Sequence, residues 1–193
     1  MGKTALLVCD LQQGVLSSIP TLPADYLARA AATIQAARSA GAQIIYIAIG
    51  FRPGHADLSP RNKVRAYVAG KPTHFVTGDA SAAIDPLVAP VAQSESGGDM
   101  IVTKRRFSAF ADTELQLVLR SLGITDLVLF GVVTSGVVLS TARAAGDLDY
   151  TVTVLEDLCA DRDAEVHEVL VRKVLPMQAD VVTAEAWLAG LKA

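Results

Sequence analysis

The chain has 193 residues, of which 51% are hydrophobic and 19% charged, a composition that suits one domain with an apolar core and excludes a disordered chain. Its 17 basic and 20 acidic residues leave a net charge of -3 without a basic block, which argues against nucleic acid as a partner. The apolar runs are far shorter than the roughly 18 residues of a membrane-spanning helix. We expect a single cytoplasmic domain over residues 1–193 that binds neither nucleic acid nor membrane.

Short apolar segments alternate along the chain with longer amphipathic ones, a pattern typical of strand–helix units around a parallel sheet. Strands that are covered on both faces are almost entirely apolar. The strands predicted on this basis are 5–9, 43–49, 100–103, 127–132, 151–155 and 181–183. The predicted helices, placed with the help of glycine and proline stop signals, are 24–39, 113–122, 136–147, 164–175 and 184–191.

One connection, residues 51–99, breaks this alternation because Pro, Gly, Ser and Asn cluster there around at most one or two short helices. A connection of this length inside a compact domain is usually functional or mobile. With right-handed crossovers, the whole pattern predicts a three-layer α/β/α sandwich with its pocket at the carboxyl ends of the strands.

Two charged residues stand at the ends of predicted strands. Asp10 follows the first strand, where burial would raise its pKa toward acid–base use, or where it could simply cap a turn. Lys104 follows the third strand and precedes Arg105 and Arg106. Because alternate side chains of a strand face opposite sides, at least one of the three cations could turn inward and hold Asp10 ionised. The alternative is a solvated basic turn.

A third segment, 131–143, combines a strand end, a tight loop and the start of a helix, where backbone N–H groups can bind an anion or oxyanion. Thr134 and Ser135 in this loop are interpreted as helix-capping residues rather than nucleophiles. Val133 occupies the position at which a nucleophile elbow requires glycine.

These segments, in this order, resemble the isochorismatase-like hydrolases, also called cysteine hydrolases. The resemblance covers nearly the whole chain and rests on Asp10 with Gln12, on Lys104 followed by the segment 107–110, on the segment 131–145 and on the segment 155–161. It implies a six-stranded parallel sheet in the order 3-2-1-4-5-6, which would make Asp10 and the loop after Gly131 neighbours. It also implies a homodimer or homotetramer.

The resemblance places the nucleophilic cysteine of the family's amidases at Val137, a residue that cannot start acyl-enzyme chemistry. Cys9 and Cys159 are predicted to pack in the first strand and in the loop after the fifth. One branch, the isochorismatases, lacks the cysteine and works with the aspartate and the lysine. The family also implies a cis peptide between Val132 and Val133, which would aim the N–H groups of Val133 and Val137 at an oxyanion.

Five residues are predicted to bind the substrate. Arg52 and Arg61 in the long connection are candidates for a substrate carboxylate, because a guanidinium binds that group in a bidentate way. Gln12, Phe107 and Ser135 complete the set. No cofactor or metal is expected, although the resemblance to nicotinamidases leaves open a metal site at His55, Asp57 and His74.

The sequence therefore predicts a hydrolase for a small carboxylate-bearing molecule, with Asp10 as general acid–base, Lys104 tuning its charge and water as nucleophile. The alternative is a catalytically degenerate relative that binds a small molecule or a protein partner. A serine hydrolase acting through Ser135 or Ser108 would require a nearby histidine base.

Overall fold

The computed structural model describes residues 2–20, 22–92 and 97–191. Its centre is a six-stranded, all-parallel sheet in the order β3-β2-β1-β4-β5-β6, as the family resemblance implied. The strands are β1 (Lys3–Cys9), β2 (Gln43–Ile49), β3 (Met100–Lys104), β4 (Ile124–Val132), β5 (Thr151–Ala160) and β6 (Asp180–Val182). The strand order reverses between β1 and β4, and the carboxyl ends of these two strands meet there.

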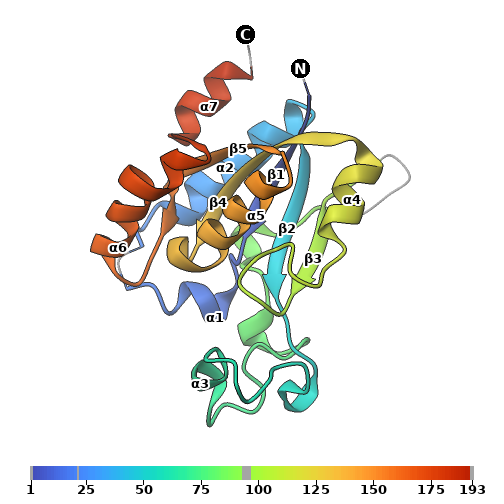
Figure 1. Cartoon of the computed structure of the whole chain (residues 1–193), viewed down its shortest axis with the longest axis vertical. Coiled ribbons are helices and arrows are strands. Elements are labelled where there is room, and N and C mark those ends of the chain that lie inside the picture. Colours follow the sequence, from blue (N-terminus) through green and yellow to red (C-terminus); the bar gives the residue numbers. More distant parts are fainter. Residues whose placement is uncertain (1, 21, 93–96, 192–193) are drawn as a thin grey trace.

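Helices cover both faces of the sheet, so the predicted three layers are present (Figure 1). The helix α2 (Tyr26–Ser39) contacts β2 and α7 (Ala184–Gly190), whereas α4 (Leu115–Leu122) contacts β4 and α5 (Leu139–Asp147) contacts β5. In Figure 1, α5 lies in front of the sheet and α2 behind it. Two further helices are α1 (Gln13–Leu16), which the sequence did not predict, and α6 (Ala164–Val169).

Strand β5 continues beyond the predicted end at residue 155 because a bulge interrupts its pairing with β4. Leu129 pairs with Val154 and Gly131 pairs with Cys159, so β5 carries three extra residues between these pairs. Polar residues in the bulge have charged partners: Arg29 Nη1 lies 3.2 Å from Asp157 Oδ2. The bulge thus explains polar residues inside a strand, and it places Cys159 in β5 rather than in the predicted loop.

Two predicted helices contain π-helical turns. The segment predicted as a helix over 136–147 starts with a π turn at Thr134–Val138 before α5, and the segment 164–175 becomes α6, a π turn at Leu170–Val174 and a 3-10 turn at Leu175–Met177. Such π turns occur often at functional sites. The first of them lies directly after β4, at the carboxyl edge of the sheet.

The first part of the long connection forms a lobe below the carboxyl ends of the strands, and its later part returns along the sheet to contact α2 (Figure 1). The described residues of the connection include one short helix, α3 (Arg65–Val68), and three 3-10 turns at Pro53–His55, Ala80–Ala82 and Pro86–Val88. Phe51, Leu58 and Val68 form an apolar cluster of their own, separate from the main core around the sheet. This cluster holds the lobe in place over the end of the sheet.

Within the described ranges, no helix has the length and apolar character needed to cross a lipid bilayer.

Candidate active site

The close approach of β1 and β4 sets the position of the site. Gly131 in β4 pairs with Cys9, the last residue of β1, and has a φ of 137°. A Cβ at this position would lie 2.0 Å from the carbonyl oxygen of Cys9, so only glycine fits. Asp10, the residue that follows Cys9, has a left-handed backbone with a φ of 53°. Left-handed backbones are uncommon for residues with a side chain and cluster at functional sites.

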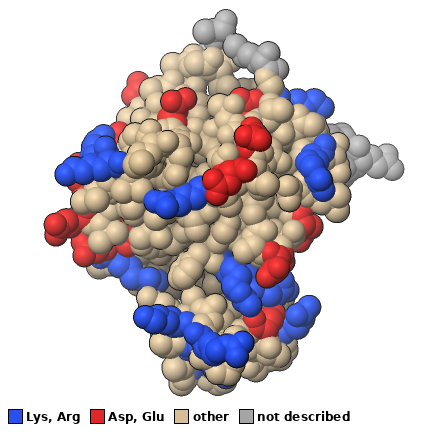
Figure 2. Space-filling model, in the orientation of Figure 1, with Lys and Arg blue, Asp and Glu red and all other residues tan. Residues whose placement is uncertain are grey.

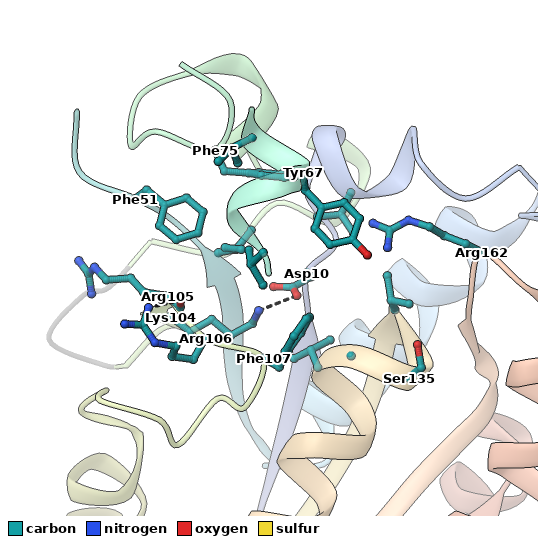
Figure 3. A pocket seen from close by; sticks show the side chains of 17 residues that line it. Asp10, Phe51, Tyr67, Phe75, Lys104, Arg105, Arg106, Phe107, Ser135 and Arg162 are labelled. Atoms are coloured by element: carbon teal, nitrogen blue, oxygen red, sulfur yellow. Dashed lines mark hydrogen bonds and ion pairs between the residues drawn. The ribbon is translucent and has the colours of Figure 1, made fainter. Parts of the chain in front are cut away.

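Asp10 and Lys104 form a buried ion pair at the carboxyl edge of the sheet. Lys104 Nζ lies 2.8 Å from Asp10 Oδ2 (Figure 3), and the two residues are 2% and 6% exposed. Burial raises the pKa of the Asp10 carboxyl, and the Lys104 ammonium opposes part of this rise. Asp10 Oδ1 is buried and has no hydrogen-bond partner within the described part of the chain. One carboxylate oxygen therefore has capacity for an incoming group.

A cavity of about 190 Å³ opens beside this pair. Its walls are mainly apolar and come from the end of the sheet, from the lobe and from the loop after β4. The lining residues that carry the chemistry discussed below are Asp10, Lys104, Arg106, Phe107, Val137 and Arg162. Figure 2 shows basic side chains gathered over the lower lobe and around the hollow above it. The cavity thus combines apolar walls with a basic surround, which suits a small anionic ligand.

The loop after β4 is fixed by an acidic residue that the sequence did not single out. Asp161, which follows β5, accepts a hydrogen bond from the backbone N–H of Ser135 at 2.6 Å. Neither Thr134 nor Ser135 caps the helical turn with its side chain, so the capping interpretation was wrong. The turn is stabilised from outside by Asp161 instead, while Ser135 lines the cavity. The peptide bond between Val132 and Val133 is cis, as predicted.

A histidine lies near this loop, but it contacts neither candidate serine. His167 Nδ1 is 2.9 Å from the hydroxyl oxygen of Thr134, which is fully buried. The hydroxyl of Ser108 accepts the backbone N–H of Phe110. The hydrogen bonds of the described residues include no serine–histidine pair, and the arrangement required for a serine hydrolase is absent from that part of the chain.

The two cysteines lie outside the lining of the cavity. Cys9 and Cys159 are both buried free thiols. Burial raises the pKa of Cys9 well above its usual value and that of Cys159 to about 12. Val137, the position that the resemblance assigns to the nucleophile, lines the cavity together with Val133. A thiolate nucleophile is therefore not available from either cysteine.

The structure brings some of the predicted substrate-binding residues to the cavity and leaves others away from it. Phe107 and Ser135 line it. Gln12 does not: its amide nitrogen donates to the carbonyls of Ile49 and Ala82, and its amide oxygen accepts the N–H of Ile49. Gln12 thus joins the end of β2 to the lobe. Its amide is committed to the backbone, and Gln12 does not line this cavity.

The two arginines predicted to bind a substrate carboxylate also lie outside the cavity. Arg52 is largely exposed, with Nη1 3.6 Å from Asp57 Oδ2, and Arg61 is exposed on the lobe. The guanidinium groups that line the cavity belong instead to Arg105, Arg106 and Arg162. The basic run after β3 pointed to the first two, but nothing in the sequence around Arg162 singled it out.

The residues of the possible metal site do not converge. Asp57 Oδ2 lies 2.6 Å from Arg105 Nε, and His55 Nε2 lies 2.8 Å from the carbonyl oxygen of His74. Burial alone would raise the pKa of Asp57, but hydrogen bonds from Arg52 and Arg105 lower it below its usual value. Among the residues that the structure describes, no group of three or more His, Cys, Asp or Glu side chains could hold a metal ion.

The sequence and the fold match a known family. The model of the isochorismatase domain matches residues 4–186. The chain belongs to the isochorismatase family. The isochorismatase family protein YecD of Escherichia coli O157:H7, described as uncharacterized, is 30% identical over 192 residues, which cover 97% of this chain and 96% of YecD. The family resemblance predicted from Asp10, Lys104 and the segment after Gly131 is confirmed.

Two other relatives extend the comparison. The maleamate amidohydrolase of Pseudomonas putida is 30% identical over 186 residues, which cover 94% of this chain and 83% of that enzyme. A solved structure of an isochorismatase family protein from Burkholderia thailandensis superposes with a TM-score of 0.83 at 29% identity, over 99% of this chain and 96% of that one. The likeness in both sequence and fold supports assignment to the isochorismatase-like hydrolases.

Proposed function

We propose that the chain hydrolyses a small carboxylate-bearing molecule, with water as the nucleophile and Asp10 as the group that carries the proton. The observation on which this rests is the buried Asp10–Lys104 pair, in which Oδ2 contacts the ammonium at 2.8 Å while Oδ1 has no partner among the described residues. An ionised carboxylate that lines a small cavity and has one unpaired oxygen is suited to general-base catalysis.

For an amide substrate, the proposed step begins when Asp10 Oδ1 accepts a proton from water. The water oxygen then bonds to the carbonyl carbon, and the π electrons of the carbonyl move onto its oxygen, which the backbone N–H groups of Val133 and Val137 would stabilise. When the carbonyl re-forms, the bond from carbon to nitrogen breaks and Asp10 returns its proton to the leaving amine. The Lys104 ammonium keeps Asp10 ionised before the water is activated.

The environment of the thiols supports a route without a covalent intermediate. Both cysteines are buried, and burial raises the pKa of each. The residue at the position predicted for the nucleophile is Val137, which has no heteroatom. The activity of the maleamate amidohydrolase relative supports amides of small unsaturated acids as the first compounds to assay.

The test is turnover by the Asp10→Asn variant. The assay uses maleamate, other short carboxylate-bearing amides and a carboxylate-bearing vinyl ether with the wild-type chain. For any compound that is hydrolysed, Asp10→Asn should lower kcat by roughly 100-fold or more, because the amide cannot accept the proton. Activity of the variant close to that of the wild type would contradict the proposal.

Asp99→Asn provides a matched control. Asp99 forms another buried ion pair, with Arg38 Nη2 2.6 Å from its Oδ2, and does not line the cavity. Loss of that pair should lower the free energy of unfolding by about 3 kcal/mol while leaving kcat unchanged. If kcat falls in both variants, the fall in Asp10→Asn results from lost stability rather than from loss of the proton acceptor.

Val137 favours a second candidate, a binding protein without catalytic activity, because a valine stands where the resemblance predicts the nucleophile. On this alternative, small carboxylates bind in the cavity but none of the assayed compounds is hydrolysed. Turnover at about 1 per second or faster on any of them would exclude it.

A further inference from the structure

The cavity carries more positive charge than its own acidic groups neutralise. Four cations line it: Lys104, Arg105, Arg106 and Arg162. Lys104 pairs with Asp10, and Arg105 Nε lies 2.6 Å from Asp57 Oδ2. Across residues 2–20, 22–92 and 97–191, Arg106 and Arg162 form no ion pair. Two guanidinium charges therefore remain without a counter-charge at the cavity.

Arg106 is held in place by neutral groups. Its Nη1 donates hydrogen bonds to the carbonyl oxygen of Asp57 at 3.2 Å and to that of Arg105 at 2.7 Å. Backbone carbonyls orient a guanidinium without cancelling its charge. The side chain is half-buried, so an anion that reached it would be partly shielded from water and would interact with it more strongly than at an open surface.

Arg162 is exposed and is also positioned by neutral groups, which come from a different part of the chain. Its Nε and Nη2 donate to the hydroxyl oxygen of Ser18 at 3.2 and 3.1 Å, and its guanidinium carbon lies 5.3 Å from the centre of the Tyr67 ring. The hydroxyl and the ring are neutral. They fix the orientation of the guanidinium between α1, the lobe and the loop after β5, and leave its charge available.

The two guanidinium groups lie on opposite sides of Asp10. In Figure 3, Arg106 is beside Lys104 and Phe107, Arg162 is beside Tyr67, and the Asp10 carboxylate lies between the two sides. The rest of the cavity lining is largely apolar and includes Val15, Val68 and Val137. A ligand with one anionic end could satisfy only one of these cations at a time.

We infer that the cavity selects a small dicarboxylate, with one carboxylate on Arg106, the other on Arg162 and an apolar body above Asp10. Arg106 and Arg162 are then the specificity-determining residues of the site. The inference rests on the proposed function for its connection to hydrolysis, since the bond to be cleaved would lie between the two anchors. The binding preference itself can be tested without any turnover.

The experiment measures the binding of matched acids by isothermal titration calorimetry. The pairs are succinate and butyrate, glutarate and valerate, and adipate and hexanoate. For at least one length, the dicarboxylate should bind the wild-type chain about tenfold more tightly than its monocarboxylate partner, because charge-assisted hydrogen bonds form at both ends. Equal affinities within all three pairs would overturn the inference.

Substitution of each anchor shows whether these two residues produce the preference. In Arg162→Gln and in Arg106→Gln, the dicarboxylate and its matched monocarboxylate should bind with about equal affinity. Arg120→Gln is the control: Arg120 is an exposed arginine of α4 outside the cavity, and its loss changes the net charge equally. Retention of the preference in both cavity variants, or an equal loss in Arg120→Gln, would contradict the assignment. Circular dichroism verifies that each variant is folded.

The Asp10→Asn variant separates this inference from the proposed function. It should bind the preferred dicarboxylate at least as tightly as the wild type, because it removes a negative charge from between the anchors. A dicarboxylate preference without hydrolysis of any compound would sustain the inference and refute the proposed function. The hydrolysis assay also includes amides and vinyl ethers that carry two carboxylates. Hydrolysis restricted to compounds with one carboxylate would refute the inference and leave the proposed function in place.

Discussion

At the scale of single residues, the unusual feature of the site is that its buried carboxylate has only one of its two oxygens paired. The ammonium of Lys104 contacts Oδ2 of Asp10, and Oδ1 is buried without a partner in the described chain. An unpaired buried acceptor costs about 1–3 kcal/mol, so its presence points to a ligand that completes it. The left-handed backbone of Asp10 adds a second local cost at the same residue.

The raised pKa of Asp10 gives a pH prediction. A general base acts when ionised, so kcat/KM should rise with pH through an apparent pKa above the usual value of 3.8. Lys104 lowers this pKa, and Lys104→Gln should therefore move the rise in kcat/KM to higher pH. Carbon-13 NMR of the Asp10 carboxyl measures the same shift without a substrate. An unchanged or lower pKa in Lys104→Gln would refute the coupling.

The sequence predicted some residues of the site and not others, for a physical reason. Asp10 and Lys104 could be found because a charge at the end of an apolar strand lies at the edge of the sheet. Arg162 could not be found in this way, because it lies in a polar loop next to Asp161. Its position at the cavity depends on contacts with Tyr67 and Ser18, which are distant in the sequence. Arg52 was preferred instead, although its side chain is 68% exposed.

At the scale of elements, the site depends on the contact between β1 and β4. Strand cores were predictable because strands buried on both faces are continuously apolar, and β2 was predicted with its observed bounds. The extension of β5 was not predictable, because its bulge places the charged residues Glu156 and Asp157 inside the strand. The π turn after β4 was not predicted either, because Asp161, the residue that fixes it, comes from another strand end.

The contact between β1 and β4 gives a stability prediction. Gly131→Ala should lower the free energy of unfolding by about 3 kcal/mol or more, because the new Cβ would meet the backbone of Cys9, which cannot move aside cheaply. Gly41→Ala is the control, since Gly41 also has a positive φ but no atom within 4 Å of the added Cβ, and about 1 kcal/mol is expected there. Urea unfolding measures both. Equal losses would show that the contact with Cys9 has no special cost.

At the scale of the whole molecule, large apolar side chains remain on the surface. Leu87, Leu117 and Met177 are 67%, 61% and 83% exposed, and Ile101 is half exposed on the edge strand β3. Scattered exposed apolar residues are normal in monomers, so they do not by themselves define an interface. They are compatible with the homodimer or homotetramer that the family resemblance implies.

Assembly is therefore tested by mass in solution. The chain has a mass of 20.2 kDa, and light scattering coupled to size-exclusion chromatography should give two or four times this value. A mass of one chain at all concentrations would contradict the prediction. The measurement should be repeated at high salt, since contacts made through apolar side chains weaken less with salt than contacts between exposed charges.

The separate apolar cluster of the lobe has a consequence for how the protein can change over generations. Phe51, Leu58 and Val68 form a cluster distinct from the main core, and Ile49 and Phe75 pack against both. Phe51 and Val68 also line the cavity. A substitution of Phe51 or Val68 can thus reshape the pocket without altering a side chain of the main core. New ligands can be acquired by divergence in the lobe while the sheet keeps Asp10 and Lys104 in place.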